Sequence, residues 1–353
     1  MQTFFIVAIL VLGFLITFQI AKASEYVAVL RGEEKARKQT NKVNAFMLLA
    51  FLVIGLIGVY YCNERLKGKI LGEPASDHGI LVDRMLYITI ALTGVVFIIT
   101  QVCLFWFSFK YQESDTRKPY YYPHNNKLEM IWTVIPAITL TILVGFGIFY
   151  WYKITGNAPD KSMIVEVTGK QFGWEFRYPG NDKVLGKKYF KNVSPEKNNP
   201  AGQLWDDKYN QDDIFVEQEM HLVVNKPVKL VINSKDVIHD VGLAHFRMKM
   251  DAVPGTPTTM WFTPRFTTKQ MIEKTGKPDF VYEISCDQMC GKGHYSMRGV
   301  IVVETQEEFD AWLAGKKPQY LVANPDKDPS VKKDSVISNV SAIGAKTQMK
   351  MRN

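Results

Sequence analysis

The chain has 353 residues, of which 47% are hydrophobic, and a formal net charge of +8. This length predicts two or three folded parts, and four cysteines are too few for a disulfide framework. The positive charge does not indicate nucleic-acid binding, because the basic residues form no stripe interleaved with aromatic side chains.

Four apolar stretches near the N-terminus are long enough to cross a bilayer, which requires about 20 residues. They cover residues 3–21, 43–62, 85–109 and 130–152, and none carries a charge near its middle. We therefore expect four transmembrane helices. The first stretch is similar to a signal peptide but lacks a basic N-terminal region, so we expect it to be retained.

The loops between these stretches differ in positive charge. Residues 22–42 contain six Lys and Arg and residues 110–127 contain four, whereas residues 63–83 contain three. The positive-inside rule places the two richer loops in the cytoplasm. Both termini, and everything after residue 152, are then expected on the periplasmic (outer) side of a bacterial inner (plasma) membrane as a multi-pass protein.

Beyond the last apolar stretch the pattern changes to short alternating segments bounded by Gly, Pro, Asn and Asp. Many short strands with such turns predict an all-β sandwich or barrel. The predicted strands cover residues 163–169, 172–178, 214–224, 229–233, 260–263, 281–285 and 298–304. Residues 179–211 are polar and rich in lysine, so we expect them to form a surface insertion.

The C-terminal part is predicted to contain one helix, within residues 305–320. Thr305 and Glu308 have the spacing of a capping box, and Gly315 is a helix stop. Residues 321–353 are polar and are predicted to be disordered.

One short stretch concentrates metal-binding residue types: Cys286, Cys290, His294 and Met297. A disulfide between the two cysteines is one reading in an oxidising compartment. Zinc favours thiolate and imidazole, but thioether serves it poorly. Thiolates, imidazoles and a weak axial methionine are the ligands of copper electron-transfer sites, which also need a second histidine. The residues alone leave these readings open.

Three other histidines could supply that second imidazole. His239 is the best candidate, because it follows the strand-like residues 229–238 and lies where a sandwich loop can reach the cysteine motif. His221 lies in an alternating strand, which favours a packed or surface histidine. His245 has no support from spacing.

The motifs in this part of the chain resemble those of subunit II of the haem–copper cytochrome c oxidases. They are DVIHD (236–240), KMDAVPG (249–255) and C-x3-C-x3-H-x2-M, in this order and after a membrane anchor. The resemblance also includes LEMIWTVIPAITL (128–140) and GKQFGWEFRYPG (169–180), and covers roughly residues 84–313.

The resemblance implies a membrane-anchored all-β protein with a cupredoxin-like domain. That domain would cover residues 156–304 and follow a transmembrane hairpin at residues 84–155. Residues 1–83 would then form two additional transmembrane helices. The residues that the resemblance assigns to a dinuclear copper centre (CuA) are two bridging cysteines, two histidines and two weak ligands: Cys286, Cys290, His239, His294, Met297 and the backbone carbonyl of Gln288.

Such a centre accepts electrons from a cytochrome c, or from a cytochrome c domain of a partner complex. It passes them to haem in subunit I, where oxygen is reduced and protons are translocated, with subunit III as a further neighbour. A CuA subunit of another terminal reductase is an alternative, but the IWTVIP segment favours the oxidase. A quinol-oxidase subunit would lack the copper ligands, and a purely structural module would hold a Cys286–Cys290 disulfide.

Three positions need separate comparison with the family. Gln288 replaces the usual glutamate that helps to bind magnesium at the subunit interface, so the resemblance leaves magnesium open. Phe172 replaces the usual tryptophan at the donor-docking face, which indicates an altered donor or a larger respiratory complex. Trp174 is a docking candidate or a core residue. Glu129 matches the carboxylate at the entrance of a proton path, or it caps a helix N-terminus.

Acidic residues also cluster within residues 206–219: Asp206, Asp207, Asp212, Asp213, Glu217 and Glu219. They are candidates for contact with a basic cytochrome and equally for a solvated surface.

Overall fold

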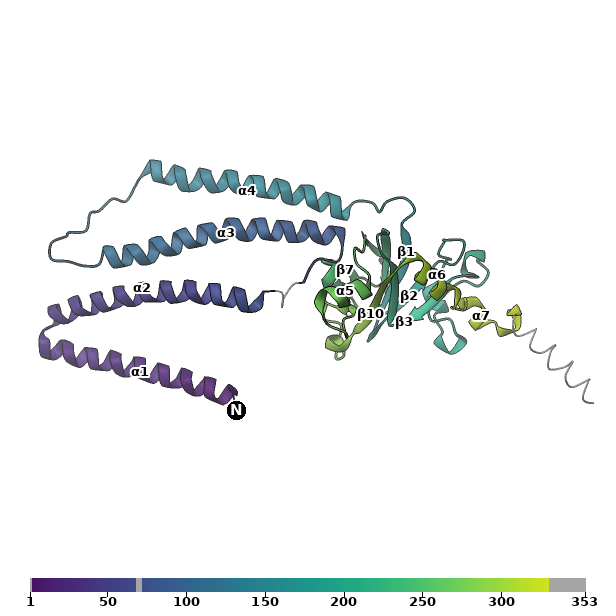
Figure 1. Ribbon diagram of the computed structural model, residues 1–353, viewed down its shortest axis with the longest axis horizontal. Helices are drawn as coiled ribbons and strands as arrows, with labels where there is room; N and C mark the ends of the chain where they lie inside the picture. The colour runs from purple at the N-terminus through teal and green to yellow at the C-terminus, as the bar shows by residue number, and fades with distance from the viewer. Residues whose placement is uncertain (1, 68–71, 330–353) are drawn as a thin grey trace, which may run out of the picture. The chain divides into compact units, whose positions relative to one another are not determined.

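The computed structural model describes residues 2–67 and 72–329. The chain divides into two compact units, Met1–Ile70 with Leu86–Val144, and Leu71–Met85 with Gly145–Asn353. Figure 1 shows the long helices and the strands of the sandwich. The four long helices are α1 (Gln2–Arg31), α2 (Glu33–Leu66), α3 (Asp77–Lys110) and α4 (Asn126–Thr155).

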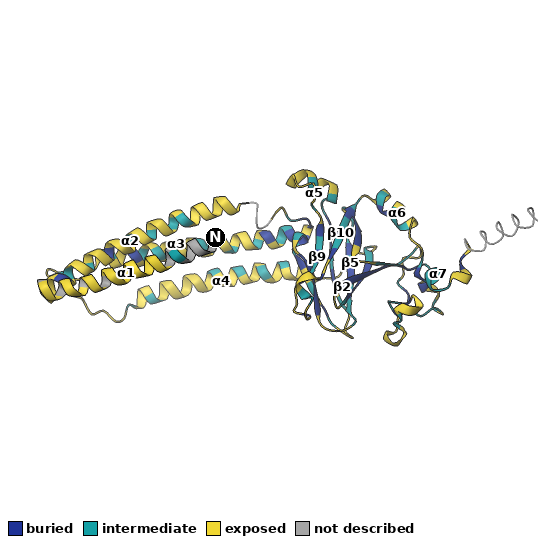
Figure 2. Cartoon of the chain, turned by 90° about the horizontal axis from the view of Figure 1, so that it is seen from below, coloured by how far each residue is buried: buried dark blue, intermediate teal, exposed yellow. Residues whose placement is uncertain are grey.

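Among the described residues, three helices are long and apolar enough to cross a membrane. They are α2, α3 and α4, with mean hydropathy values of 2.4, 2.3 and 2.1. Most of their apolar side chains are exposed, as Figure 2 shows, which suits contact with lipid. The fourth predicted span, residues 3–21, is not among these three, which were sought in the described residues alone. Residues 3–21 do form a helix, α1, but this helix continues through the polar residues up to Arg31.

Within the first unit, helix α2 contacts α3 and the loop that follows α3. Arg37 pairs with Glu113 at 2.9 Å, and Lys38 pairs with Asp115 at 2.6 Å. Further along the helices, Phe46 packs edge-on against Phe109 with their ring centroids 5.2 Å apart. Helix α2 is thus tied to the helical hairpin that follows it.

The second unit contains two five-stranded sheets, which confirms the predicted cupredoxin-like sandwich. The first sheet has the order β3-β2-β1-β5-β8, and the second has the order β4-β10-β9-β6-β7. The strands of the first sheet are β1 (Met163–Lys170), β2 (Gly173–Tyr178), β3 (Ile214–Glu217), β5 (Val228–Ser234) and β8 (Thr258–Phe262). Those of the second are β4 (Glu219–Val223), β6 (His239–Leu243), β7 (Met248–Ala252), β9 (Tyr282–Cys286) and β10 (Arg298–Glu304).

Alternation of apolar side chains builds the core between the sheets. In β5, Leu230 and Ile232 are fully buried, while Val231 between them is only partly buried. Trp174, Leu222 and Ile284 add large buried side chains from β2, β4 and β9. Each fully buried aliphatic or aromatic side chain contributes roughly 1.5–3 kcal/mol, so this core holds a rigid frame.

The strand predictions fail at two places. The segment predicted as one strand over residues 214–224 is broken at Gln218, whose φ of 63° turns the chain, so β3 and β4 join different sheets. Strands β6 and β7 were not predicted, because polar residues interrupt their apolar pattern. A short helix, α5 (Thr268–Thr275), was also missed.

The segment before α3 is anchored to the sandwich within the second unit. Ala75 and Ser76 are fully buried, and the backbone N–H of Ala75 donates to the carbonyl of His245 at 2.8 Å. The Arg247 guanidinium donates to Asp83 on the first turns of α3 at 2.9 Å. The start of α3 is therefore fixed to the domain that follows α4.

The C-terminal helix begins as predicted. Thr305 caps α6 (Gln306–Ala314), and its reciprocal bonds with Glu308 complete a capping box. The predicted disorder from residue 321 is wrong at its start, since α7 (Gln319–Ala323) and a 3-10 helix, η6 (Pro325–Lys327), form there. The Gln319 amide donates to the Asn198 carbonyl and holds this segment against the insertion. Residues 330–353 of the predicted tail lie outside the described residues.

Candidate metal centre

Two neighbouring strands bring the predicted ligands together. His239 is the first residue of β6, and Cys286 is the last residue of β9. These strands pair antiparallel, with Val241 opposite Cys286. The chain then loops through Cys290 and returns in a 3-10 helix, η5 (His294–Ser296), directly before Met297. The sheet therefore fixes one histidine and one cysteine, and the loop adds the other donors.

The donor atoms converge around the two sulfurs. Cys286 Sγ and Cys290 Sγ lie 3.7 Å apart, and both cysteines are free and buried. His239 Nδ1 lies 3.8 Å from Cys286 Sγ, and His294 Nδ1 lies 3.7 Å from Cys290 Sγ. Met297 Sδ is 3.8 Å from Cys290 Sγ, and the Gln288 carbonyl is 3.1 Å from Cys286 Sγ. The two sulfurs thus lie side by side, and each of the other four predicted donors lies next to one of them.

The orientation of His239 is set by a neighbouring carboxylate. Its Nε2 atom lies 2.7 Å from Asp236 Oδ1, while its Nδ1 atom faces the thiols. A ligating histidine usually donates its second ring N–H to such a partner. Although burial acts to raise the pKa of Asp236, hydrogen bonds from the Gln171 N–H and from His239 hold that pKa below its usual range. The carboxylate is thus kept ionised to accept the proton.

The thiols need a cation before they can act as thiolates. Burial, together with the neighbouring Cys286 thiol, raises the pKa of Cys290 to about 11. Metal binding displaces such protons, because the thiolate is the ligand. The buried pair is therefore suited to hold a metal ion.

Copper fits this donor set better than zinc. His239, Cys286 and Cys290 already place their ligand atoms within 4.8 Å of one another. A zinc site uses four donors and rarely thioether, whereas six donors, including Met297, gather here. Thiolates and thioethers are soft ligands that suit copper, and imidazole suits it too. Each thiol has its own histidine, so the set divides into two groups, as two copper ions would require.

Comparison with known proteins decides the family. The family model of the cytochrome c oxidase subunit II transmembrane domain matches residues 75–149, and that of the periplasmic domain matches residues 163–305. The alternative cytochrome c oxidase subunit 2 of Bradyrhizobium diazoefficiens is 34% identical over 245 residues, covering 69% of this chain and 83% of that protein. The chain belongs to the cytochrome c oxidase subunit II family.

Further matches are weaker. Cytochrome c oxidase subunit 2 of Cereibacter sphaeroides is 26% identical over 240 residues, covering 64% of this chain and 73% of that protein. Among solved structures, the periplasmic domain of subunit II of the cytochrome oxidase of Bradyrhizobium japonicum matches at 22% identity and a TM-score of 0.32. That match covers 46% of this chain and 99% of that one. Both family models begin after α1 and α2, so these two helices lie outside the matched residues.

The other histidines of this subunit II domain have packing partners. His221 lies between Glu219 at 2.6 Å and Glu304 at 2.7 Å, and it stacks on Trp312. His221 is therefore a packed histidine and not a metal ligand. His245 packs edge-on against Phe280 and Tyr282, and burial lowers its pKa. Neither histidine lies with the cysteines.

The two aromatic docking candidates have different surroundings. Phe172 is 40% exposed, and its ring covers the ligand loop so closely that a Cβ on Gly293 would lie 2.6 Å from it. Trp174 is fully buried in the core. The docking prediction for Trp174 is therefore wrong, because β2 turns this side chain inward while Phe172 lies outside the strand.

Glu129 lies at the N-terminus of α4, as predicted. Its Oε1 atom accepts a hydrogen bond from the Asn125 N–H at 3.1 Å, and Asn125 Oδ1 accepts one from the Leu128 N–H. These bonds satisfy donors that a helix start leaves free. The contacts account for a capping role, and the proton-path role stays a prediction.

Several of the clustered carboxylates are engaged within the domain. Asp213 is fully buried against Arg177, and Asp207 accepts from the Lys187 and Tyr209 N–H groups. Glu217 pairs with Lys170 at 2.7 Å, and Glu219 contacts His221. These internal bonds weaken the reading of this cluster as a surface for a basic cytochrome.

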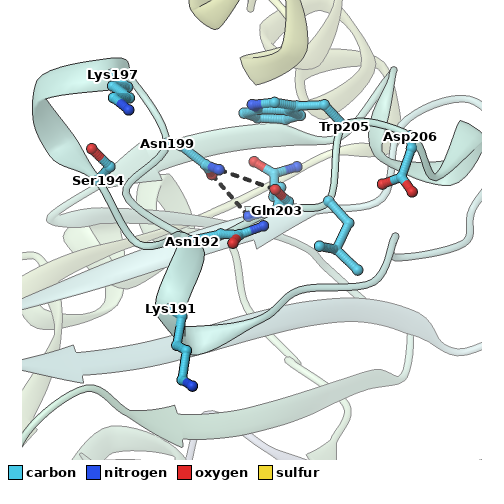
Figure 3. Close-up of a pocket in the computed structure, with 9 residues that line it drawn as sticks. Lys191, Asn192, Ser194, Lys197, Asn199, Gln203, Trp205 and Asp206 are labelled. Carbon is cyan, nitrogen blue, oxygen red and sulfur yellow. Dashed lines mark hydrogen bonds between the residues drawn. The ribbon is translucent and has the colours of Figure 1, made fainter.

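A polar cavity of about 320 Å³ lies in the insertion between β2 and β3 (Figure 3). Within it, the Asn199 side chain bonds to the backbone N–H and carbonyl of Gln203 at 2.8 and 3.0 Å. Lys191 and Trp205 also line this cavity. None of its lining residues is a predicted metal ligand, so it is separate from the metal centre.

Proposed function

We propose that this chain is the electron-accepting subunit of a respiratory cytochrome c oxidase. It takes electrons from a cytochrome c, or from a cytochrome c domain of a partner complex, and passes them to haem in subunit I. Oxygen reduction and proton translocation take place in that partner. The observation that carries the proposal is the convergence of four donor atoms, from His239, His294, Met297 and the Gln288 carbonyl, on the thiols of Cys286 and Cys290.

The residues of the chain hold the centre rather than make or break bonds. When bound, copper supplies one-electron storage shared over the two thiolates. Strands β6 and β9 fix His239 and Cys286, and Asp236 keeps the His239 Nδ1 atom turned to the sulfurs. Burial excludes water from both thiols. A frame that moves little on a change of charge favours fast electron transfer, and its second-shell hydrogen bonds tune the potential.

The location and partners follow from the same proposal. The charge of the loops supports a location of the sandwich on the periplasmic side of a bacterial inner membrane. Subunit I would receive the electrons, and subunit III would belong to the same complex. Helices α1 and α2, which lie outside the matched family models, are then available for contacts with these subunits or with a larger respiratory complex.

Copper loading tests the proposal directly. The full-length protein, purified in detergent and treated with copper, is expected to bind two coppers per chain. It should turn purple and absorb in the near infrared. A colourless protein with an oxidised Cys286–Cys290 disulfide, or one that binds a single zinc in preference, would overturn the proposal.

The identity of the donor is tested at Phe172. We expect soluble mitochondrial-type cytochrome c to reduce the copper-loaded protein slowly, because phenylalanine replaces the usual tryptophan at the docking face. Phe172→Trp should then raise the rate in stopped-flow measurements. Rapid reduction of the unmodified protein that Phe172→Trp does not improve would contradict this expectation.

A further inference from the structure

Gln171 contacts both of the chain segments that carry the metal donors. Its side-chain Nε2 donates to the Cys290 carbonyl at 2.6 Å. Its backbone N–H donates to Asp236 Oδ2 at 2.7 Å. The other oxygen of Asp236 lies 2.7 Å from His239 Nε2. One residue outside the donor set thus connects the cysteine loop with the histidine strand.

On the histidine side, Gln171 acts through Asp236. With His239 Nδ1 turned to Cys286 Sγ, the Nε2 atom is the one left to carry the ring proton and donate it to Asp236. Asp236 is held in place by the N–H groups of Gln171 and Val237, each at 2.7 Å. The position of residue 171 therefore fixes the plane and the tautomer of the ligating ring.

On the cysteine side, the loop passes directly under the Gln171 amide. Gly291 follows Cys290 with a φ of +131°, and a Cβ there would lie 2.9 Å from Gln171 Nε2. The loop turns on its own bonds, such as the His294 N–H to the Gly291 carbonyl at 3.1 Å. The bond from Gln171 ties its middle to the sandwich, next to the donor Cys290.

We propose that Gln171 is a positioning residue of the metal centre, holding the Cys290 loop and His239 at a fixed separation. The inference rests on the proposed copper function. Its amide does not touch the donor atoms themselves, so its effect passes through the Cys290 backbone and through Asp236. Loss of one such outer contact reduces metal affinity by roughly 10–100-fold in comparable sites.

The test compares three full-length proteins in detergent: unmodified, Gln171→Met and Gln211→Met. Methionine has nearly the length of glutamine and keeps the backbone N–H, but it cannot donate to the Cys290 carbonyl. Gln211 is an exposed glutamine of the insertion and provides the matched control. Three quantities are measured: the rate of copper release to a chelator, the visible and paramagnetic resonance spectra, and the thermal unfolding of the metal-free protein.

Gln171→Met is expected to release copper about tenfold faster and to show a shifted spectrum, while its metal-free unfolding matches that of Gln211→Met. Release and spectra equal to those of the unmodified protein would overturn the inference and leave the copper function standing. An unmodified protein that binds no copper would overturn both. If Gln171→Met does not accumulate, Gln171→Asn, one methylene too short to reach the carbonyl, is measured against the same two outcomes.

Discussion

Two buried polar clusters in the second unit are stabilised in different ways. Around Arg177, the Nε atom lies 2.6 Å from Glu166 Oε2, and the Nη1 atom lies 2.7 Å from Asp213 Oδ2. Lys188 adds a second cation beside Glu166. Two cations therefore face two carboxylates. The acidic groups face cations of the protein itself, so this cluster has no need of an added cation.

The metal centre instead turns electron-pair donors toward one another. Thiols, imidazoles, a thioether and a carbonyl meet within 3.1–3.8 Å around Cys286 and Cys290. Such a group becomes favourable when a cation binds between its members. The contrast teaches that burial of polar groups does not by itself mark a binding site. A binding site for a cation is indicated where buried electron-pair donors face one another without a cation of the protein between them.

The largest effect is expected from removing a thiol. Cys290→Ala should abolish the purple absorption, because the remaining thiol cannot form the shared pair. The protein should still fold, since Cys290 lies in a loop of the metal centre and not in a strand of either sheet. Absorption spectra and copper content measure the outcome, with Cys103→Ala in α3 as the control. If Cys290→Ala retained the absorption band, the two thiols would not be acting as a metal-binding pair, and the contrast with the Arg177 cluster would be wrong.

The opposite effect is expected in the balanced cluster. Arg177→Met leaves Glu166 and Asp213 buried without their shared cation, which destabilises a protein by about 3–5 kcal/mol. Thermal unfolding of the full-length protein should shift strongly, while the copper spectrum of the molecules that remain folded is unchanged. Lys197→Met, an exposed lysine of the insertion, is the control. Equal unfolding of both variants would mean that the Arg177 cluster is not needed for stability.

The two clusters also differ in how far the sequence predicts them. The spacing of Cys286, Cys290, His294 and Met297 indicates a metal motif, because these donors lie in one short loop. The Arg177 cluster gave no such signal, since Arg177 and Asp213 are 36 residues apart and meet only when the insertion folds back. Asp213 therefore looked in the sequence like one of a group of surface carboxylates.

Strand alternation accounts for other successes and failures. It predicted most strands of the sandwich, whose buried side chains recur at every second residue. It missed β6, because this strand is buried on both faces and contains Asp240 and Gly242. A Cβ at Gly242 would lie 2.3 Å from the Asp287 carboxylate, which occupies the space beside this glycine. Alternation also grouped Phe172 with Trp174, although the strand begins at Gly173 and leaves Phe172 outside it.

A smaller effect is expected where the ligand loop meets Phe172. Gly293→Ala puts a Cβ 2.6 Å from the Phe172 ring, so the ring or the loop must move. Overpacking of this kind costs about 1–3 kcal/mol. The copper spectrum should shift without being lost, because the donors themselves remain. Gly94→Ala, where a Cβ would meet nothing within 4 Å, is the control. An unchanged spectrum would show that Phe172 does not constrain the loop.

The most gradual effect concerns pH and the Arg177 cluster. Burial raises the pKa of Asp213 from its ordinary 3.8 to about 7, although Arg177 and the Gly186 N–H oppose this rise. Between these values the folded protein holds a proton that the unfolded chain has lost. Stability contributed by this group is therefore complete below pH 4 and falls as the pH rises through 7, by at most about 1.4 kcal/mol per pH unit.

Asp213→Asn separates this contribution from other titrating groups, because an amide stays neutral throughout. The melting temperature of the full-length protein is measured from pH 5 to pH 7. Glu166 keeps its charge over this range, because Arg177 lowers its pKa against the opposing effect of burial. The unmodified protein should lose stability more steeply over this range than Asp213→Asn does. Parallel curves would mean that Asp213 is ionised throughout, and that Arg177 compensates its charge as fully as it does that of Glu166.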